Sequence, residues 1–185
     1  MATRIALWAD ITREERFFTS LLFHDISANP APMLSLLKNS LRLPARTTIS
    51  DVGFEVCFFR DAAFASLIER HSSLEKQTFD LVITFSRRRI AIIEAKAQQG
   101  FHFAQIAALH QARDIMVASA LWPAKEVDIC ALTSSLYTPS NKVRSAFDGI
   151  CTWRDIATIY PRNSKHYEWA NELYRDRARR DLPGN

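Results

Sequence analysis

The chain has 185 residues, 48% of them hydrophobic, which is enough for one domain with a sizeable buried core. Its formal net charge of +4 is modest for a protein that binds nucleic acid. No apolar run approaches the roughly 18 residues that a membrane-spanning helix needs, and the opening residues are too weakly apolar for a secretory signal. Three widely spaced cysteines without zinc-type spacing fit reduced core thiols, so we expect no membrane association and a cytoplasmic location.

Two helices are predicted in the N-terminal part, over residues 12–23 and 33–41, with a proline-containing break between them. Glu15 stands three residues after Thr12, which is the spacing of a capping box, so its side chain could close the start of the helix. Glu15 also borders the apolar face of the same helix, from which it could point towards a sheet. The sequence leaves these two interpretations of Glu15 open.

A strand is predicted over residues 49–59 and a helix over residues 62–70. Glu55 lies on the polar side of that strand, opposite an apolar face formed by residues such as Val52 and Phe54. Its position is compatible with a metal ligand and with a solvated strand glutamate. The sequence favours the solvated glutamate.

The middle of the chain predicts a hairpin of two apolar strands, residues 79–85 and 90–97, joined by a basic turn. Two acids and a lysine interrupt these strands: Asp80, Glu94 and Lys96. Charged groups rarely lie in buried strands unless they are paired or bind metal. Because alternate residues of a strand face the same side, Glu94 and Lys96 share one face. This pattern indicates a functional site.

The pairing register decides whether Asp80 joins that face. We predict an even register in which Ser86 opposes Ile90. Asp80 then lies opposite Lys96 and diagonal to Glu94, at starting separations of about 5 Å and about 7 Å. A divalent metal could sit between the two carboxylates, and Mg²⁺ suits such a site because it prefers few carboxylates, several waters and a substrate phosphate. An ion-paired sheet edge is the competing interpretation.

The turn of the hairpin carries three consecutive arginines, Arg87, Arg88 and Arg89. Such a cluster can neutralise phosphates and supply sequence-independent affinity for nucleic acid. It can equally be a solvated turn that protects the edge of a sheet from aggregation. Both interpretations stay open from the sequence.

The C-terminal half predicts further alternation of helices and strands. A helix is expected over residues 101–119, strands over 127–133 and 150–152, a helix from Trp153, and a basic helix over 167–180. No internal repeat or linker divides the chain. The whole pattern predicts one α/β domain, residues 1–185, with a central mixed β-sheet of about five strands flanked by helices.

At Asp80, Glu94 and Lys96 the sequence resembles the PD-(D/E)XK nuclease superfamily, whose fold is the restriction-endonuclease-like core. The resemblance makes Asp80 the first acid of the motif, Glu94 its second acid and Lys96 its lysine. Phe79 stands in place of the name-giving proline, which is commonly replaced in the superfamily. The resemblance extends over N-terminal helices 12–41, a catalytic core 49–133 and a C-terminal strand and helices 150–180, but only the three motif residues are specific.

The resemblance implies a site for Mg²⁺, or Mn²⁺ in its place, held by Asp80, Glu94 and the backbone carbonyl of Ala95. Lys96 would position the attacking water or stabilise the phosphate in the transition state. Supporting roles are implied for three further residues that match positions where relatives carry an acid or a glutamine: Glu15, Glu55 and Gln105. Gln105 is also an ordinary helix residue.

We therefore expect a metal-dependent nuclease that hydrolyses phosphodiester bonds of DNA, in restriction, defence or repair. RNA stays open as a substrate, because nothing in the sequence reads a 2′-hydroxyl group. The alternative is a catalytically inactive nucleic-acid-binding or protein-interaction component with the same fold, although the intact acid–acid–lysine set argues against it. A single domain without a second specificity module would depend for its targeting on a homodimer, on a partner protein, or on the structure of the substrate rather than its sequence.

Overall fold

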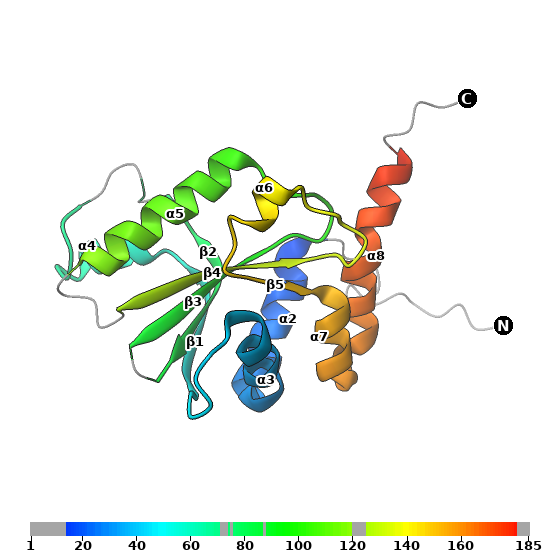
Figure 1. Cartoon of the computed structure of the whole chain (residues 1–185), viewed down its shortest axis with the longest axis horizontal. Helices are drawn as coiled ribbons and strands as arrows, with labels where there is room; N and C mark the ends of the chain where they lie inside the picture. The colour runs from blue at the N-terminus through cyan, green and yellow to red at the C-terminus, as the bar shows by residue number, and fades with distance from the viewer. Residues whose placement is uncertain (1–13, 71–73, 75, 87, 120–124, 181–185) are drawn as a thin grey trace, which may run out of the picture.

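The computed structural model describes residues 14–70, 74, 76–86, 88–119 and 125–180, and of residues 175–180 only the backbone. Five strands form its sheet: β1 (Ile49–Val56), β2 (Phe79–Phe85), β3 (Arg89–Ala95), β4 (Glu126–Thr133) and β5 (Gly149–Thr152). Seven α-helices lie in the described ranges: α2 (Glu15–Ala28), α3 (Pro30–Leu41), α4 (Phe58–Phe64), α5 (Phe103–Ala118), α6 (Asn141–Arg144), α7 (Trp153–Ile159) and α8 (Ser164–Arg180), with a 3-10 turn at Pro161–Asn163 (Figure 1). The predicted α/β class is confirmed.

The sheet is mixed, with strand order β1-β2-β3-β4-β5. The first three strands are antiparallel neighbours, whereas β4 runs parallel to β3 and β5 runs parallel to β4. The parallel connections pass through α5 and α6, as such crossovers require. Strand β3 is therefore central, and a charged side chain on it is enclosed by neighbours on both sides.

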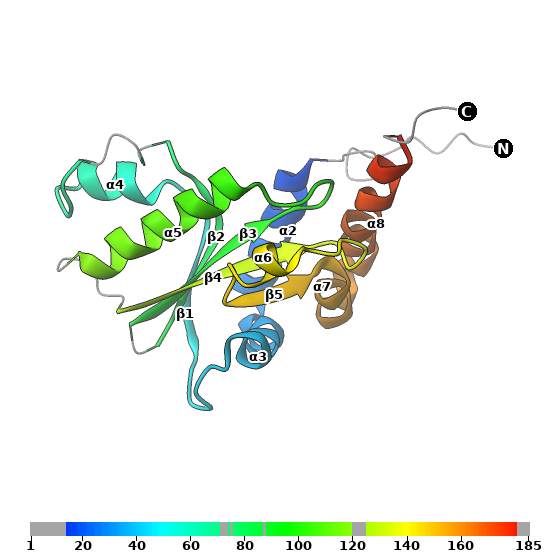
Figure 2. The ribbon, with the colours of Figure 1, turned by 45° about the horizontal axis from the view of Figure 1, so that its top comes forward.

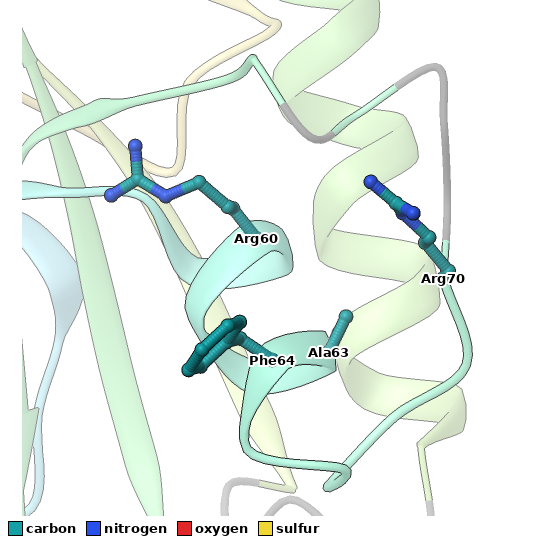
Figure 3. A pocket seen from close by; sticks show the side chains of 4 residues that line it. All are labelled: Arg60, Ala63, Phe64 and Arg70. Atoms are coloured by element: carbon teal, nitrogen blue, oxygen red, sulfur yellow. The ribbon is translucent and has the colours of Figure 1, made fainter.

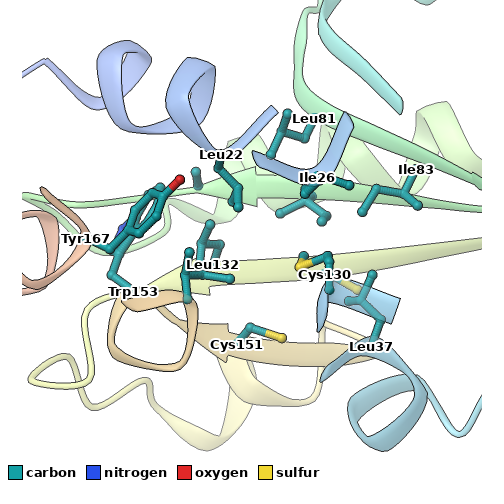
Figure 4. Close-up of a cluster of buried hydrophobic side chains, with 14 of the residues drawn as sticks. Leu22, Ile26, Leu37, Leu81, Ile83, Cys130, Leu132, Cys151, Trp153 and Tyr167 are labelled. Carbon is teal, nitrogen blue, oxygen red and sulfur yellow. The ribbon is translucent and has the colours of Figure 1, made fainter. Parts of the chain in front are cut away.

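Helices cover both faces of the sheet (Figures 1 and 2). One face carries α2, α3, α7 and α8, and the other carries α4, α5 and α6. Figure 4 shows the core of the first face, where Leu22, Leu37, Trp153 and Tyr167 from these helices meet Leu81 of β2. The strand residues that point to the opposite face form the second core; they include Val82, Ile90 and Ile92.

The N-terminal helices are longer than the sequence predicts. Helix α2 runs to Ala28, and the predicted residues 12 and 13 lie outside the described part of the chain. Helix α3 starts at Pro30, because a proline is tolerated in the first turn, where its missing N–H has no intrahelical partner. The break falls at Asn29, whose N–H bonds back to the Asp25 carbonyl at 2.9 Å.

The bounds predicted for the strand 49–59 and the helix 62–70 are wrong. Strand β1 ends at Val56, just after Glu55 takes a left-handed backbone with φ of 52°. Helix α4 already begins at Phe58, and Phe58, Phe59 and Ala62 are its buried residues. Aromatic residues favour strands, but here the burial of one helical face overrides that preference.

The hairpin forms as predicted, but its register is shifted by two residues. Phe85 pairs with Arg89 and Leu81 with Ile93, so the turn consists of residues 86–88. Arg88 takes the left-handed position with φ of 64°, where a glycine is usual. A shift of two residues preserves which side chains share a face. Asp80 still joins Glu94, but it opposes Glu94 directly and is not opposite Lys96.

The C-terminal elements lie close to their predicted ranges. Helix α5, strands β4 and β5, and the start of α7 at Trp153 each match within two residues, and α8 starts three residues earlier than predicted. Thr152 and Asp155 form a capping box that fixes the start of α7. All three cysteines are free thiols, and within the described ranges no helix is long and apolar enough to cross a bilayer.

Candidate active site

Two carboxyl groups meet where β2 begins and β3 ends. Asp80 is the second residue of β2, and Glu94 is the last but one of β3. One oxygen of Asp80, Oδ2, accepts the backbone N–H of Ala95 at 2.8 Å, and the charge of Asp80 acts on the Glu94 carboxyl group. The Glu94 side chain is only 6% exposed and is thus largely removed from water, whereas Asp80 is half-buried.

The Lys96 ammonium group lies against this pair. Its Nζ donates to Glu94 Oε1 at 2.8 Å and to the Ala95 carbonyl oxygen at 2.8 Å, and it lies 3.3 Å from Glu15 Oε1. The backbone on both sides is also fixed. The Lys96 N–H donates to the Leu132 carbonyl at 2.8 Å, and the indole N–H of Trp153 donates to the Lys96 carbonyl at 3.1 Å. The lysine is therefore held in one position by groups from several elements.

Glu15 points from the start of α2 towards the sheet. Its Oε2 accepts the backbone N–H of Ala97 at 2.7 Å, while its Oε1 faces Lys96. The N-cap of α2 is Glu14, which makes no side-chain capping bond, and Thr12 lies outside the described residues. Of the two interpretations that the sequence left open, the contacts of Glu15 correspond to the one directed at the site.

Gln105 is the residue of α5 that contacts the carboxyl pair. It lies in the first turn of that helix, and its side-chain amide donates a short hydrogen bond to Glu94 Oε1. The Glu94 oxygen thus accepts from both Lys96 and Gln105. These two donors fix the orientation of the Glu94 carboxyl group.

Glu55 lies beside the site and not within it. The β1–β2 pairing places it next to Asp80, and its negative charge contributes to raising the pKa of Asp80. Its own carboxylate pairs with Arg16 at 2.6 Å, with 24% of the Glu55 side chain exposed. Glu55 is therefore a partly solvated, ion-paired glutamate, close to the interpretation that its sequence position favours.

Burial works against the charged form of every acid at the site. Burial, and then the charge of Asp80, raise the pKa of Glu94 to about 7. Burial is also the largest cause that raises the pKa of Asp80 and of Glu15. For Lys96 burial acts to lower the pKa, but the carboxylates of Glu94 and Glu15 raise it, and the net pKa is above the ordinary value. The carboxylates of Glu94 and Glu15 thus favour the protonated form of Lys96.

The donor set fits a hard divalent cation with sparse protein ligation. Glu15, Asp80 and Glu94 bring three acids against the single ammonium of Lys96, so a cation would relieve their repulsion. Within the described residues no three His, Cys, Asp or Glu side chains are arranged to hold a metal by themselves. Two carboxylates completed by water and substrate oxygens are what Mg²⁺ prefers. The Ala95 carbonyl could join with its second lone pair, because Lys96 already occupies one.

The hairpin arginines lie away from this site. Asp80 is five residues before the end of β2, which at about 3.3 Å per residue puts the turn roughly 17 Å away. The Arg89 guanidinium binds Asp128 through two bonds of 2.6 and 2.7 Å, so the phosphate role expected for Arg89 does not suit its contacts. Arg88 is exposed, and Arg87 lies outside the described residues.

One contributor to the site, Trp153, and one residue beside it, Arg16, escaped sequence reasoning. Trp153 was predicted only as the start of a helix, although a buried indole needs an acceptor for its N–H, which was the available signal. Arg16, which binds Glu55, carried no signal, because nothing in its local sequence distinguishes it from other helix-surface arginines.

Comparison with known proteins identifies no family for this chain. No protein-family model matches it, and no curated protein matches it at a significant level. Any function proposed for the chain is therefore drawn from its residues and their contacts.

Proposed function

We propose that the chain is a metal-dependent nuclease that hydrolyses phosphodiester bonds of DNA, built on a restriction-endonuclease-like core. One observation carries the proposal: two carboxyl groups, the buried Glu94 and the half-buried Asp80, lie together beside the Lys96 ammonium group, which donates to Glu94. The order of these residues on a hairpin is the order that the resemblance to the PD-(D/E)XK superfamily implies. An ion pair that only stabilised the fold would not need the second, repelling acid.

Asp80 and Glu94 are the residues that would hold the divalent cation. When bound, Mg²⁺ neutralises charge at a phosphate and makes a ligated water more acidic. The buried position of Glu94 keeps bulk water from competing for its oxygens. The bonds from the Ala95 N–H to Asp80 and from Gln105 to Glu94 hold the two carboxyl groups in place.

Lys96 supplies the remaining positive charge. Because its pKa is raised, it is a fixed point charge that can stabilise negative charge developing on a phosphate. Glu15 and the Ala95 carbonyl hold the ammonium group where it is, so little reorganisation is needed when the substrate arrives. Gln105 and Glu15 act as positioning residues in this proposal.

The test is cleavage of supercoiled plasmid, linear duplex and single-stranded DNA with Mg²⁺ or Mn²⁺, compared with EDTA. We expect metal-dependent cleavage by the wild type, lost by at least 100-fold in Lys96→Ala, Asp80→Asn and Glu94→Gln, on the order of one removed electrostatic group. Asp51→Asn, an exposed acid on β1, is the matched control and should cleave normally.

Each result has a distinct meaning. Equal cleavage by wild type and Lys96→Ala would refute the site. Cleavage of RNA alone would replace DNA as the substrate. Nucleic-acid binding without any cleavage would favour the inactive binding protein with the same fold, and calorimetry with Mn²⁺ would then show whether the carboxyl pair still binds metal.

A further inference from the structure

A pocket of about 500 Å³ lies beside α4, away from the carboxyl pair. The described residues that line it are Arg60, Ala63, Phe64 and Arg70. In Figure 3 the two guanidinium groups stand on either side of Ala63, and the Phe64 ring projects from the same helix. Among the described residues, the lining thus combines two cations with an aromatic ring and contains no acid.

Phe64 has no role in the core. Its side chain is 94% exposed, whereas Phe58, Phe59 and Ala62 already bury the sheet-facing side of α4. A single exposed apolar side chain is common on protein surfaces. Phe64 differs in that it lines a pocket together with two arginines. The basic walls favour an anionic ligand.

The pocket lies on the same face of the sheet as the carboxyl pair. Helix α4 packs in the core that contains Ile92, and Glu94 faces the same side two residues later on β3. Arg60 follows Glu55 by five residues, which limits their separation to about 18 Å. Glu55 is the neighbour of Asp80 in the sheet. At about 3.4 Å per nucleotide, some five nucleotides span this distance.

We infer that the α4 pocket binds an unpaired nucleotide of the nucleic-acid substrate, with its base on Phe64 and its flanking phosphates at Arg60 and Arg70. The choice of nucleic acid as the ligand rests on the proposed function. An exposed phenyl ring can stack on any base, and arginine binds phosphate in a planar, two-pronged manner. A base inside a duplex offers no free face, so the pocket selects a single-stranded end, gap or flap.

The existing bond of Arg60 does not block this role. Arg60 Nε bonds Asp61 at 2.9 Å, but both side chains are more than 60% exposed. Exposed pairs of this kind contribute little, so a phosphate can replace Asp61 as the partner of Arg60.

The experiment is a fluorescence-anisotropy titration, in EDTA to prevent cleavage, with a labelled 20-nucleotide single strand of DNA, the same sequence in RNA, and a blunt DNA duplex. Phe64→Ala should weaken single-strand binding by about tenfold or more, the loss of one stacked base. Arg60→Ala and Arg70→Ala should each lower the salt slope by about 0.7. Blunt-duplex binding should hardly change, and the DNA and RNA arms show which strand is preferred.

The controls are Leu67→Ala, which removes another exposed apolar side chain outside the pocket, and Arg154→Ala, an exposed arginine on α7. Both should bind like the wild type. Because Phe64 makes no core contact, Phe64→Ala should keep the wild-type melting temperature.

Unchanged single-strand binding by all three pocket variants would overturn the inference, and so would equal losses for single strands and blunt duplex. Light scattering tests whether a second copy of the chain occupies the pocket instead. If Phe64→Ala turns a dimer into a monomer and leaves nucleic-acid binding unchanged, the pocket is a contact between copies. If the wild type cleaves DNA and the pocket variants bind normally, only this inference fails. If binding depends on Phe64 but no cleavage occurs, only the nuclease proposal fails.

Discussion

Glu94 is the residue whose ionisation the fold opposes most visibly. It is buried, it faces a second acid, and its pKa is raised to about 7. Lys96 and Gln105 partly offset this by donating to the same oxygen. Near neutral pH Glu94 therefore exchanges its proton, and the carboxyl pair carries one negative charge when Glu94 is protonated and two when it is not.

The stability of the protein should consequently depend on pH. The folded pKa of Glu94 lies above the unfolded value of 4.5, so the folded state holds its proton more tightly. This stabilisation is complete below pH 4.5 and is lost as pH rises through about 7, with an upper bound of about 3–4 kcal/mol. In urea melts in EDTA, the free energy of unfolding should fall from pH 5 to pH 8, and Glu94→Gln should flatten that fall.

Glu168→Gln, an exposed acid on α8, is the control and should keep the wild-type pH dependence. A Glu94→Gln variant with the same slope as the wild type would show that Glu94 titrates normally. Mg²⁺ added at pH 8 should raise the urea midpoint of the wild type, because a ligand that binds only the folded state stabilises it. Asp80→Asn should lose that increase.

At the scale of the element, the hairpin shows what sequence can and cannot specify. The shared face of Asp80, Glu94 and Lys96 was predictable, because strand alternation depends only on an even register. The register itself was not predictable, because the turn contains no glycine and Arg88 takes the left-handed position instead. The error of two residues moved the partner of Asp80 from Lys96 to Glu94.

Contacts between distant segments were the other part that sequence could not supply. The capping-box spacing of Glu15 was visible, but its actual partner, Lys96, is 81 residues away. The aromatic run at Phe58 and Phe59 was extended as a strand, although tertiary burial turns it into α4. The local sequence pattern therefore predicts the fold class and most of the elements. The residues that surround the motif can be identified only from the folded structure.

The pairing of Arg89 with Asp128 leads to a prediction for the hairpin. Both side chains are less than 20% exposed, so Arg89→Ala leaves a buried carboxylate unpaired and should destabilise the protein by about 3 kcal/mol. The salt slope of DNA binding should stay at the wild-type value, because this guanidinium is already engaged. Arg88→Ala, at an exposed position, should leave the stability nearly unchanged. Thermal unfolding and salt-dependent anisotropy measure the two effects, and a flattened slope at normal stability would restore the phosphate role of Arg89.

At the scale of the whole molecule, the site is assembled from both halves of the chain. Glu15 comes from the first described helix, the motif from the central hairpin, Gln105 from α5 and Trp153 from α7. Both layers of helices are thus represented at one end of the sheet. A substitution in either layer of helices should therefore disturb the geometry of the motif, even where Asp80, Glu94 and Lys96 are unchanged.

Trp153→Phe tests this dependence. The variant keeps an aromatic ring in the core but removes the N–H that donates to the Lys96 carbonyl, which is left buried and unpaired. We expect a loss of about 1–3 kcal/mol, seen as a melting temperature several degrees lower. Metal-dependent cleavage should fall as well, although Trp153 is not in contact with the carboxyl pair. Trp169→Phe, a partly buried control, should keep its cleavage rate; equal losses in both variants would point to stability alone.

The spread of these partners along the chain has a consequence during synthesis. Asp80 and Glu94 lie on one hairpin with a three-residue turn, so they can meet within about 1–10 μs once both have left the ribosome. Trp153 follows Lys96 by 57 residues, a delay of roughly 3–11 s at bacterial and eukaryotic elongation rates. During those seconds the two acids can meet, but the Lys96 carbonyl does not yet have its Trp153 partner. A growing chain therefore brings the two acids together before Trp153 can bind the backbone of Lys96.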